Sequence, residues 1–359
     1  MKGIVISGYY GFGNSGDDAL LLSIINDLKK HGLNDTITVL SSNPEETKKI
    51  YGVNAVNRIN PFAVIYSIFF CRMFISGGGT LIQDGTSTKS LLYYLYLIKI
   101  AKLLGKKVML YANGIGPVNK DSNKIKCSKI LNTVDVITVR DEKSMGVLSD
   151  MNISKPTIRL TADPVFLLDK SQNIDNIINK IGNENYFCVS VRNTKNLNSD
   201  FEKSLASAVD AINSKYNLTP VFVPLQKSDN KICADTIKHM KTPSVILPHT
   251  LSPSEVMAVV SGACMAVGMR LHMLIYAAAA AIPIVGIVYD PKVSGFMEYA
   301  RQNLYINDCD VNENNLYKLF ESCISHADEI KSVLLETKEE LVSLARENAQ
   351  IAAKLYKGM

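Results

Sequence analysis

The chain has 359 residues, of which 47% are hydrophobic and 20% charged, a composition that excludes a disordered or low-complexity protein. This length exceeds what one hydrophobic core normally absorbs, so two domains are expected. The formal net charge of +5 is not gathered into a Lys/Arg stripe, which disfavours a nucleic-acid binder and favours an anionic small molecule or a membrane surface as partner.

Short apolar runs alternate with longer helical patterns along the first half, as they do in βαβ units built on a parallel sheet. Strands are expected at residues 3–7, 36–41, 72–76, 108–111 and 136–139, and helices at 19–30 and 91–104. The helix over 91–104 is apolar almost all round and includes Lys99 and Lys102, so it is either buried or in contact with a membrane.

Residues 169–185 are polar and mark the expected boundary to a second alternating series. Its strands are expected at 186–191, 221–223, 244–247, 263–267 and 284–288, and the chain becomes helical after residue 310. The predicted fold class is α/β, with two Rossmann-like doubly wound domains and C-terminal helices. The expected domains are 1–170 and 185–325, with a helical segment over 326–359 that packs across both.

Signals for export and for metal or disulfide chemistry are missing from the sequence. The N-terminus lacks the cleavage site of a signal peptide, and the longest uncharged stretch, 273–289, is too short for a bilayer span and contains Pro283. The seven cysteines are scattered, with no Cys-x-x-Cys pair. We therefore expect a cytoplasmic protein in a reduced compartment, without a structural metal.

A glycine-rich loop follows the first predicted strand. Residues 11–16, Gly-Phe-Gly-Asn-Ser-Gly, have the spacing of a phosphate-binding loop that leads into a helix. Asp17 and Asp18, however, put negative charge where a pyrophosphate would lie. Two interpretations stay open: a tight turn before a capped helix, or a site for sugar hydroxyls to which Asn14 also contributes.

Two further loops of this kind follow later strands. One is Ser-Gly-Gly-Gly-Thr over 76–80, which contains Gly78 and Gly79, and the other is Asn-Gly-Ile-Gly-Pro over 113–117, which begins with Asn113. A single loop of this type is weak evidence. Three of them at successive strand ends predict a groove in which the backbone closely approaches a ligand.

Basic side chains follow several predicted strands. Arg140 and Arg192 each stand at a strand end, where the simplest interpretation of an isolated arginine is a solvated charge or a surface ion pair. Arg270 and His272 interrupt an apolar run over 266–276. A buried arginine there needs an anion, either an acidic residue of the protein or a ligand, and the histidine is either a core residue or part of the same site.

The turn after the next strand brings Lys292 to the same edge of the predicted sheet as Arg270. Two or three cations and one imidazole at neighbouring strand ends suit a small polyanion that carries phosphate and carboxylate groups. The sequence therefore predicts an anion site in the C-terminal domain.

Seven segments, taken in order, carry a family resemblance. They are GFGNSGDDA at 11–19, FISGGG at 74–79, NGIGP at 113–117, TVRD at 138–141, TADP at 161–164, GMRLH at 268–272 and DPKVSGF at 290–296. In these segments the chain resembles the polysaccharide pyruvyl transferase family, and within it the branch that pyruvylates the glycan anchoring bacterial surface-layer proteins. One departure is Ala112-Asn113-Gly114, where many members have Gly-Gln-Gly.

The resemblance implies a GT-B-like pair of domains facing across a cleft, phosphoenolpyruvate as co-substrate, and no cofactor or metal. The implied catalytic residues are His272, Arg270 and Lys292. Donor binding is expected from Arg140, Arg270, Leu271, His272 and Lys292, and from Arg192 by its placement alone. Acceptor binding is expected from Asn14, Asp17, Asp18, Gly78, Gly79 and Asn113.

The implied reaction transfers pyruvate from phosphoenolpyruvate onto two hydroxyls of a sugar, forming a cyclic ketal and releasing phosphate. Because an imidazole titrates near neutral pH, His272 is the expected general acid, acting either on the methylene carbon or on the departing phosphate oxygen. By resemblance the acceptor is a lipid-linked disaccharide with N-acetylmannosamine, made at the inner face of the membrane. A peripheral membrane contact is therefore a further expectation, and no nucleic acid is expected.

Two other functions stay open. A GT-B nucleotide-sugar glycosyltransferase would share the architecture, but such enzymes often have an acid in the equivalent C-terminal helix, and residues 273–281 contain none. A non-catalytic glycan-binding protein would commonly use tryptophan, and the chain has none, although Tyr9, Tyr10 and Phe12 could stack on a sugar.

Overall fold

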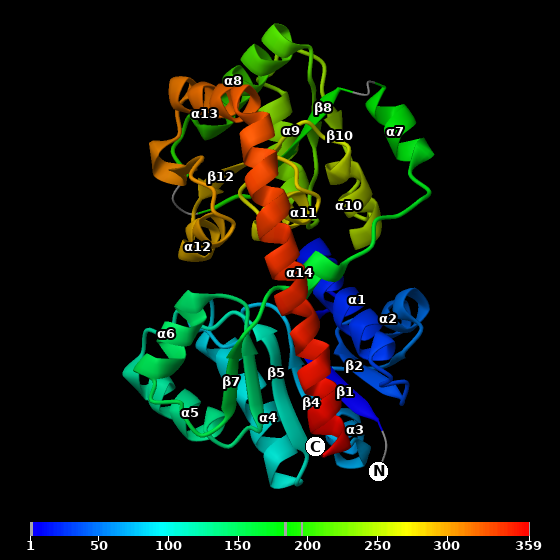
Figure 1. Ribbon diagram of the computed structural model, residues 1–359. Coiled ribbons are helices and arrows are strands. Elements are labelled where there is room, and N and C mark those ends of the chain that lie inside the picture. The colour runs from blue at the N-terminus through cyan, green and yellow to red at the C-terminus, as the bar shows by residue number, and fades with distance from the viewer. Residues whose placement is uncertain (1–2, 183–184, 195–196, 359) are drawn as a thin grey trace. The chain divides into compact units, whose positions relative to one another are not determined.

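The computed structural model describes residues 3–182, 185–194 and 197–358, which form two compact units (Figure 1). The first unit comprises Met1–Phe12, Asp17–Leu167 and Leu341–Met359, and the second comprises Gly13–Gly16 and Leu168–Glu340. Each unit is built on a parallel sheet with helices packed against it, so the predicted α/β class with two doubly wound sheets is confirmed.

The described part of the first unit holds a seven-stranded sheet in the order β3-β2-β1-β4-β5-β6-β7. Its elements are β1 (Ile4–Tyr10), α1 (Ser15–Lys30), β2 (Ile37–Ser41), α2 (Pro44–Tyr51), β3 (Asn54–Asn57), α3 (Pro61–Phe70), β4 (Met73–Gly77), α4 (Thr88–Leu103), β5 (Lys107–Asn113), α5 (Asp121–Leu131), β6 (Val136–Val139), α6 (Glu142–Asp150), β7 (Thr157–Leu160) and a 3-10 helix, η1 (Pro164–Leu167).

Alternation along the strands sends side chains to the two faces of this sheet. Ile4 and Ile6 of β1 pack with α1 and with the end of α14 (Ala327–Lys357), where Ala349 is buried. Val5, on the opposite face, packs in a cluster with buried residues of α3, α4, α5 and α6. The predicted apolar helix over 91–104 thus corresponds to α4, and most of its apolar side chains are buried in the core.

The described part of the second unit holds a six-stranded sheet in the order β10-β9-β8-β11-β12-β13. Its elements are α7 (Asp175–Ile181), β8 (Tyr186–Ser190), α8 (Phe201–Tyr216), β9 (Thr219–Phe222), α9 (Asp229–Ile237), β10 (Val245–Ile246), α10 (Pro253–Ser261), β11 (Ala266–Gly268), α11 (Leu271–Ala279), β12 (Ile284–Val288), α12 (Pro291–Tyr299), β13 (Tyr305–Asn307), the 3-10 helix η2 (Asp308–Asp310), α13 (Glu313–Ser325) and the first part of α14.

Both sheets reverse their strand order between two central strands, β1 and β4 in the first and β8 and β11 in the second. At such a switch point the loops after the two strands turn away from each other, which leaves room for a ligand at the carboxyl ends. The loops after β1 and β4 are two of the predicted glycine-rich loops. Arg192 and Arg270 follow β8 and β11.

The observed change of unit at residue 168 lies beside the expected boundary at 170–185. The C-terminal helix is divided, because α14 contributes its residues up to Glu340 to the second unit and those from Leu341 to the first. Among the described residues, no helix is both long enough and apolar enough to cross a membrane.

Candidate functional site

Residues 13–16 of the first glycine loop pack with the second unit, against α11. The backbone N–H of Ser15 donates to the Leu225 carbonyl at 2.8 Å, and the Tyr276 hydroxyl donates to the Ser15 carbonyl at 2.9 Å. A Cβ at Gly16 would overlap Nδ1 of His272. His272 and Tyr276 are one turn apart on α11, so one face of this helix contacts the loop at both positions.

Arg270 stands at the N-cap of α11 and pairs with a carboxylate of the protein. Its Nε donates to Oδ2 of Asp229 at 2.9 Å, and its Nη2 donates to Oδ1 of Asp229 and, at 3.1 Å, to Oε1 of Gln226. Arg270 and Asp229 are both buried. The sequence left two possible anions for Arg270, an acidic residue of the protein or a ligand. In the described structure Arg270 pairs with an acidic residue, Asp229. The pair fixes the start of α11 just before His272.

Leu271 and His272 open this helix with different surroundings. Leu271 is buried, so its side chain belongs to the core, whereas the side chain of His272 is partly exposed. The predicted donor contact at Leu271 stays a prediction. His272 therefore lies partly exposed in the second unit, and its predicted role stays a prediction.

Two predicted cations of the second unit meet around one tyrosine ring. Arg192 donates from Nη1 to the Tyr289 hydroxyl at 2.9 Å, and its Cζ lies 4.8 Å from the centroid of that ring. Nζ of Lys292 lies 5.5 Å from the same centroid and 3.7 Å from a carboxylate oxygen of Asp290. We call Arg192, Tyr289 and Lys292 the cation cluster. Nε of Arg192 is buried, and no described residue accepts a hydrogen bond from it.

Arg140 lies in the first unit, where it is buried and pairs with Asp163. Its Nη1 donates to Oδ2 of Asp163 at 2.7 Å, and its Nη2 donates to the Thr80 hydroxyl at 3.3 Å. This pair joins the TVRD and TADP segments of the sequence. The charge of Arg140 is therefore balanced by a carboxylate of its own unit.

The glycines after β4 lie against the start of α1. Gly78 and Gly79 have φ of 48° and 72°, in the left-handed region. A Cβ at Gly78 would lie 3.1 Å from the side chain of Leu20, and one at Gly79 would lie 3.3 Å from Oδ1 of Asp17. The close approach that these glycines predict is thus made, in the described structure, by the protein's own helix, with Asp17 beside the loop.

Asp18 has a perturbed carboxyl group. Burial raises its pKa to about 6, a hydrogen bond to Tyr51 opposes the rise, and the charge of Glu46 adds to it. Asn14 lies in the second unit, where its Oδ1 accepts a hydrogen bond from the Gly16 N–H at 3.1 Å. The predicted acceptor residues Asn14, Asp17 and Asp18 are therefore divided between the two units.

Asn113 is fully buried, and the predicted contact of its side chain with an acceptor stays a prediction. Its amide nitrogen donates to the carbonyl oxygens of Ser76 at 3.2 Å and Tyr111 at 3.1 Å. The side chain thus ties β5 to the end of β4. Its amide oxygen, Oδ1, is also buried, and no described residue donates a hydrogen bond to it.

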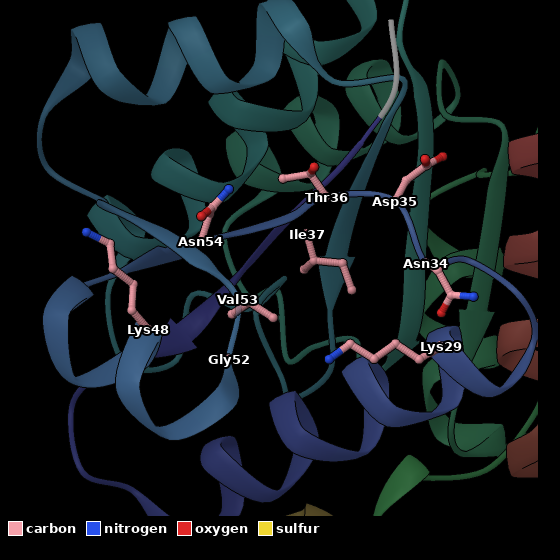
Figure 2. A pocket seen from close by; sticks show the side chains of 9 residues that line it. All are labelled: Lys29, Asn34, Asp35, Thr36, Ile37, Lys48, Gly52, Val53 and Asn54. Carbon is pink, nitrogen blue, oxygen red and sulfur yellow. The ribbon is translucent and has the colours of Figure 1, made fainter.

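A pocket of about 490 Å³ lies at the amino ends of β2 and β3 in the first unit (Figure 2). It is lined by Lys29, Asn34, Asp35, Thr36, Ile37, Lys48, Gly52, Val53 and Asn54. Because ligands of doubly wound sheets bind at the carboxyl ends of the strands, this pocket is on the opposite edge from the expected site. None of the residues predicted for the site lines it.

Sequence reasoning missed Asp229, Gln226, Tyr276 and Tyr289. A buried arginine requires an anion, but Asp229 lies 41 residues before Arg270 and has no motif around it. Tyr289 adjoins the recognised DPKVSGF segment, so its position offered a signal.

Within the described ranges, no group of three or more His, Cys, Asp or Glu residues could hold a metal ion.

Solved structures with the same fold cover the whole chain at low identity. A protein described as a UDP-N-acetylglucosamine 2-epimerase from Listeria monocytogenes has a TM-score of 0.73 at 11% identity, covering 100% of this chain and 97% of the other. The structure of S. aureus MnaA with UDP has a TM-score of 0.70 at 12% identity and covers 100% of this chain and 97% of the other. Anabaena HepE in complex with UDP-glucose has a TM-score of 0.66 at 10% identity, and both chains are fully covered. These likenesses establish a GT-B-like fold.

Comparison with curated protein sequences gives no match. The profile of one family, polysaccharide pyruvyl transferase, matches residues 14–291, which is more than half of the chain and includes residues 14–16 of the first glycine loop, the GMRLH segment and Pro291, the first residue of α12. The chain therefore belongs to the polysaccharide pyruvyl transferase family and is a transferase.

Proposed function

We propose that the protein transfers pyruvate from phosphoenolpyruvate onto two hydroxyls of one cell-wall sugar. The first sugar oxygen bonds to C2 of phosphoenolpyruvate while a proton is delivered to the methylene carbon, C3. The second oxygen then replaces phosphate on C2 and closes a cyclic ketal. Of the two hydroxyl protons, one balances the proton gained by C3 and the other leaves with inorganic phosphate.

The observation that carries this proposal is the cation cluster at the carboxyl ends of β8 and β12. A guanidinium forms two parallel hydrogen bonds with a carboxylate, and an ammonium binds phosphate as a point charge. Arg192 and Lys292 flank one ring, and a ligand carboxylate would give the buried Nε of Arg192 an acceptor. Phosphoenolpyruvate carries both anions on three carbons.

We assign proton transfer to His272, acting on C3 or on the phosphate oxygen that leaves. Gly16 and Tyr276 fix the face of α11 on which this imidazole lies. Arg270 and Arg140 already neutralise carboxylates of the protein, so we assign them to positioning rather than to direct donor contact. A guanidinium that holds the start of α11 keeps the imidazole in one orientation.

On the acceptor side we assign Asp18 as the base that takes a hydroxyl proton, because a carboxyl with a pKa of about 6 accepts protons near neutral pH. Asp17, beside Gly79, would orient the sugar. The resemblance points to a lipid-linked acceptor with N-acetylmannosamine in the cytoplasm. Transfer should then fall with an apparent pKa of about 6 as the pH is lowered, and Asp18→Asn should remove that limb of the profile.

The donor is tested by thermal unfolding with each candidate ligand. Phosphoenolpyruvate should raise the unfolding temperature, and uridine diphosphate sugars should not, since binding to the folded state alone stabilises it. The reverse result would support a nucleotide-sugar glycosyltransferase, the other function that this fold admits. Lys292→Met should weaken the effect of phosphoenolpyruvate by about ten- to a hundredfold in affinity, as expected for a lost charge-assisted contact.

The proton donor is tested by phosphate release with a saccharide acceptor, with products identified by mass spectrometry. His272→Ala should keep the stabilisation by phosphoenolpyruvate and lose turnover. His249→Ala is the matched control, since this second histidine of the same unit bonds to Asn230 through its ring nitrogen. Near-normal phosphate release by His272→Ala would reject the assignment.

A further inference from the structure

Helix α3 of the first unit presents an exposed apolar face. Its ten residues include no charged side chain, and Val64 and Ile68 face the core. On the opposite side the exposed residues are Phe62, Ile65, Tyr66, Phe69 and Phe70, which we call the α3 face. Phe62 is 85% exposed and Tyr66 66% exposed. Large aromatic groups in one exposed cluster mark an interaction surface.

The rings of the α3 face contact one another. Tyr66 and Phe70 have ring centroids 4.6 Å apart, and Phe69 and Phe70 have centroids 5.1 Å apart. Leu92, Tyr96 and Leu103 of α4 are also exposed, and α4 covers the same face of the first sheet as α3. Both helices therefore carry exposed apolar side chains.

The stretch of sequence around α3 is rich in basic residues. Residues 47–120 contain ten Lys and Arg and a single acid, Asp84, which gives a net charge of +9. The remainder has 29 basic and 33 acidic residues, a net charge of −4. The carboxylate of Asp84 is engaged by the backbone N–H groups of Asn119 at 2.7 Å and Lys120 at 3.1 Å. Lys106 lies against the Phe69 ring, with Nζ 5.6 Å from the centroid.

We infer that the α3 face docks on the surface of an anionic lipid bilayer. An aromatic helix face within a basic segment has the composition of an interfacial helix, whose apolar side enters the boundary of headgroups and acyl chains while Lys and Arg meet anionic lipids. A second copy of the chain is a poorer occupant, because self-association through this face would bring two basic segments together. The inference deepens the proposed function, since a lipid-linked acceptor is held at such a surface.

The absence of tryptophan from the sequence allows a direct test with the full chain. Phe62→Trp introduces a single tryptophan in the α3 face, and Leu335→Trp introduces one at a 47% exposed position of α14 in the second unit. Both proteins are mixed with vesicles of phosphatidylcholine alone or with phosphatidylglycerol. The emission of Phe62→Trp should shift to shorter wavelength only with the anionic vesicles, and Leu335→Trp should not change.

Binding is quantified by flotation with the same vesicles. Phe62→Ser combined with Phe69→Ser should lower the partition coefficient on the order of tenfold, since two exposed aromatic groups no longer enter the bilayer. Raised salt should weaken the binding of the unsubstituted protein. Unchanged flotation of the double variant overturns the inference, as does a blue shift of Phe62→Trp that depends on protein concentration without vesicles.

The enzymatic proposal fails separately from this one. The double serine variant should retain phosphate release with a water-soluble saccharide, because the α3 face lies outside the residues assigned to transfer. Loss of phosphate release in every protein, with normal vesicle binding, would reject the proposed reaction and leave the docking surface intact. Normal phosphate release with no binding to anionic vesicles would reject the docking surface and leave the proposed reaction intact.

Discussion

Asp18→Asn offers a measurement that isolates one buried carboxyl. Its pKa rises from 3.8 to about 6 on folding, chiefly because burial penalises the charged form. Between these values the folded chain binds more protons than the unfolded chain, so stability falls as the pH rises through this window. Each unit of pKa shift corresponds to about 1.4 kcal/mol, so ionisation of Asp18 lowers the free energy of unfolding by about 3 kcal/mol above pH 6. At pH 4 the carboxyl of the folded chain is still protonated, and most of this decrease is absent.

The amide of Asp18→Asn does not titrate, so the variant should gain about 3 kcal/mol relative to the natural chain between pH 4 and pH 7. Urea unfolding followed by circular dichroism measures the difference. Two further variants should change it in opposite directions: Glu46→Gln shrinks it by removing a charge that raises the pKa, and Tyr51→Phe enlarges it by removing a hydrogen bond that lowers the pKa. A difference between Asp18→Asn and the natural chain that is equal at both pH values would refute the reasoning.

Two other substitutions test the packing around the site. Gly16→Ala should abolish phosphate release while circular dichroism stays native, because its Cβ must displace the His272 imidazole. The control is Gly146→Ala, which should leave turnover unchanged because the added Cβ meets no atom within 4 Å. Equal activity of the two variants would contradict the contact between residue 16 and His272. Asp229→Asn should lower the free energy of unfolding by roughly 3–5 kcal/mol by leaving a buried arginine unpaired, and adding Arg270→Met should recover most of that loss in urea titrations.

The sequence was sufficient to predict the architecture but not all of its strands. Inner strands such as β11 and β12 are continuous apolar runs, because both faces of each sheet are covered by helices. The three strands that were not predicted are β3, β7 and β13, and each is an edge strand of its sheet. Their side chains are largely exposed, so their sequences lack the apolar signal on which the prediction depends.

The sequence predicts some of the contacts around the candidate site, but not the partners that make them. That Arg270 must face an anion follows from burial energetics, whereas the identity of Asp229 depends on the tertiary fold. Gly78 and Gly79 signalled a close approach correctly, but the sequence does not say whether helix or ligand approaches. The positive bias of residues 47–120 is spread through several elements, so no local run reveals it.

The division of α14 has a consequence for synthesis of the chain. β1 and its neighbours leave the ribosome early, yet Ala349 and Tyr356, which cover one side of them, are translated only after the second unit. Between Leu167 and Leu341, at usual translation rates, roughly 10 to 30 s pass during which Ile4 and Ile6 are screened by α1 alone. The N-terminal half should therefore mature only once the second half of α14 has been translated, and until then it is a natural client for chaperones that shield apolar surface.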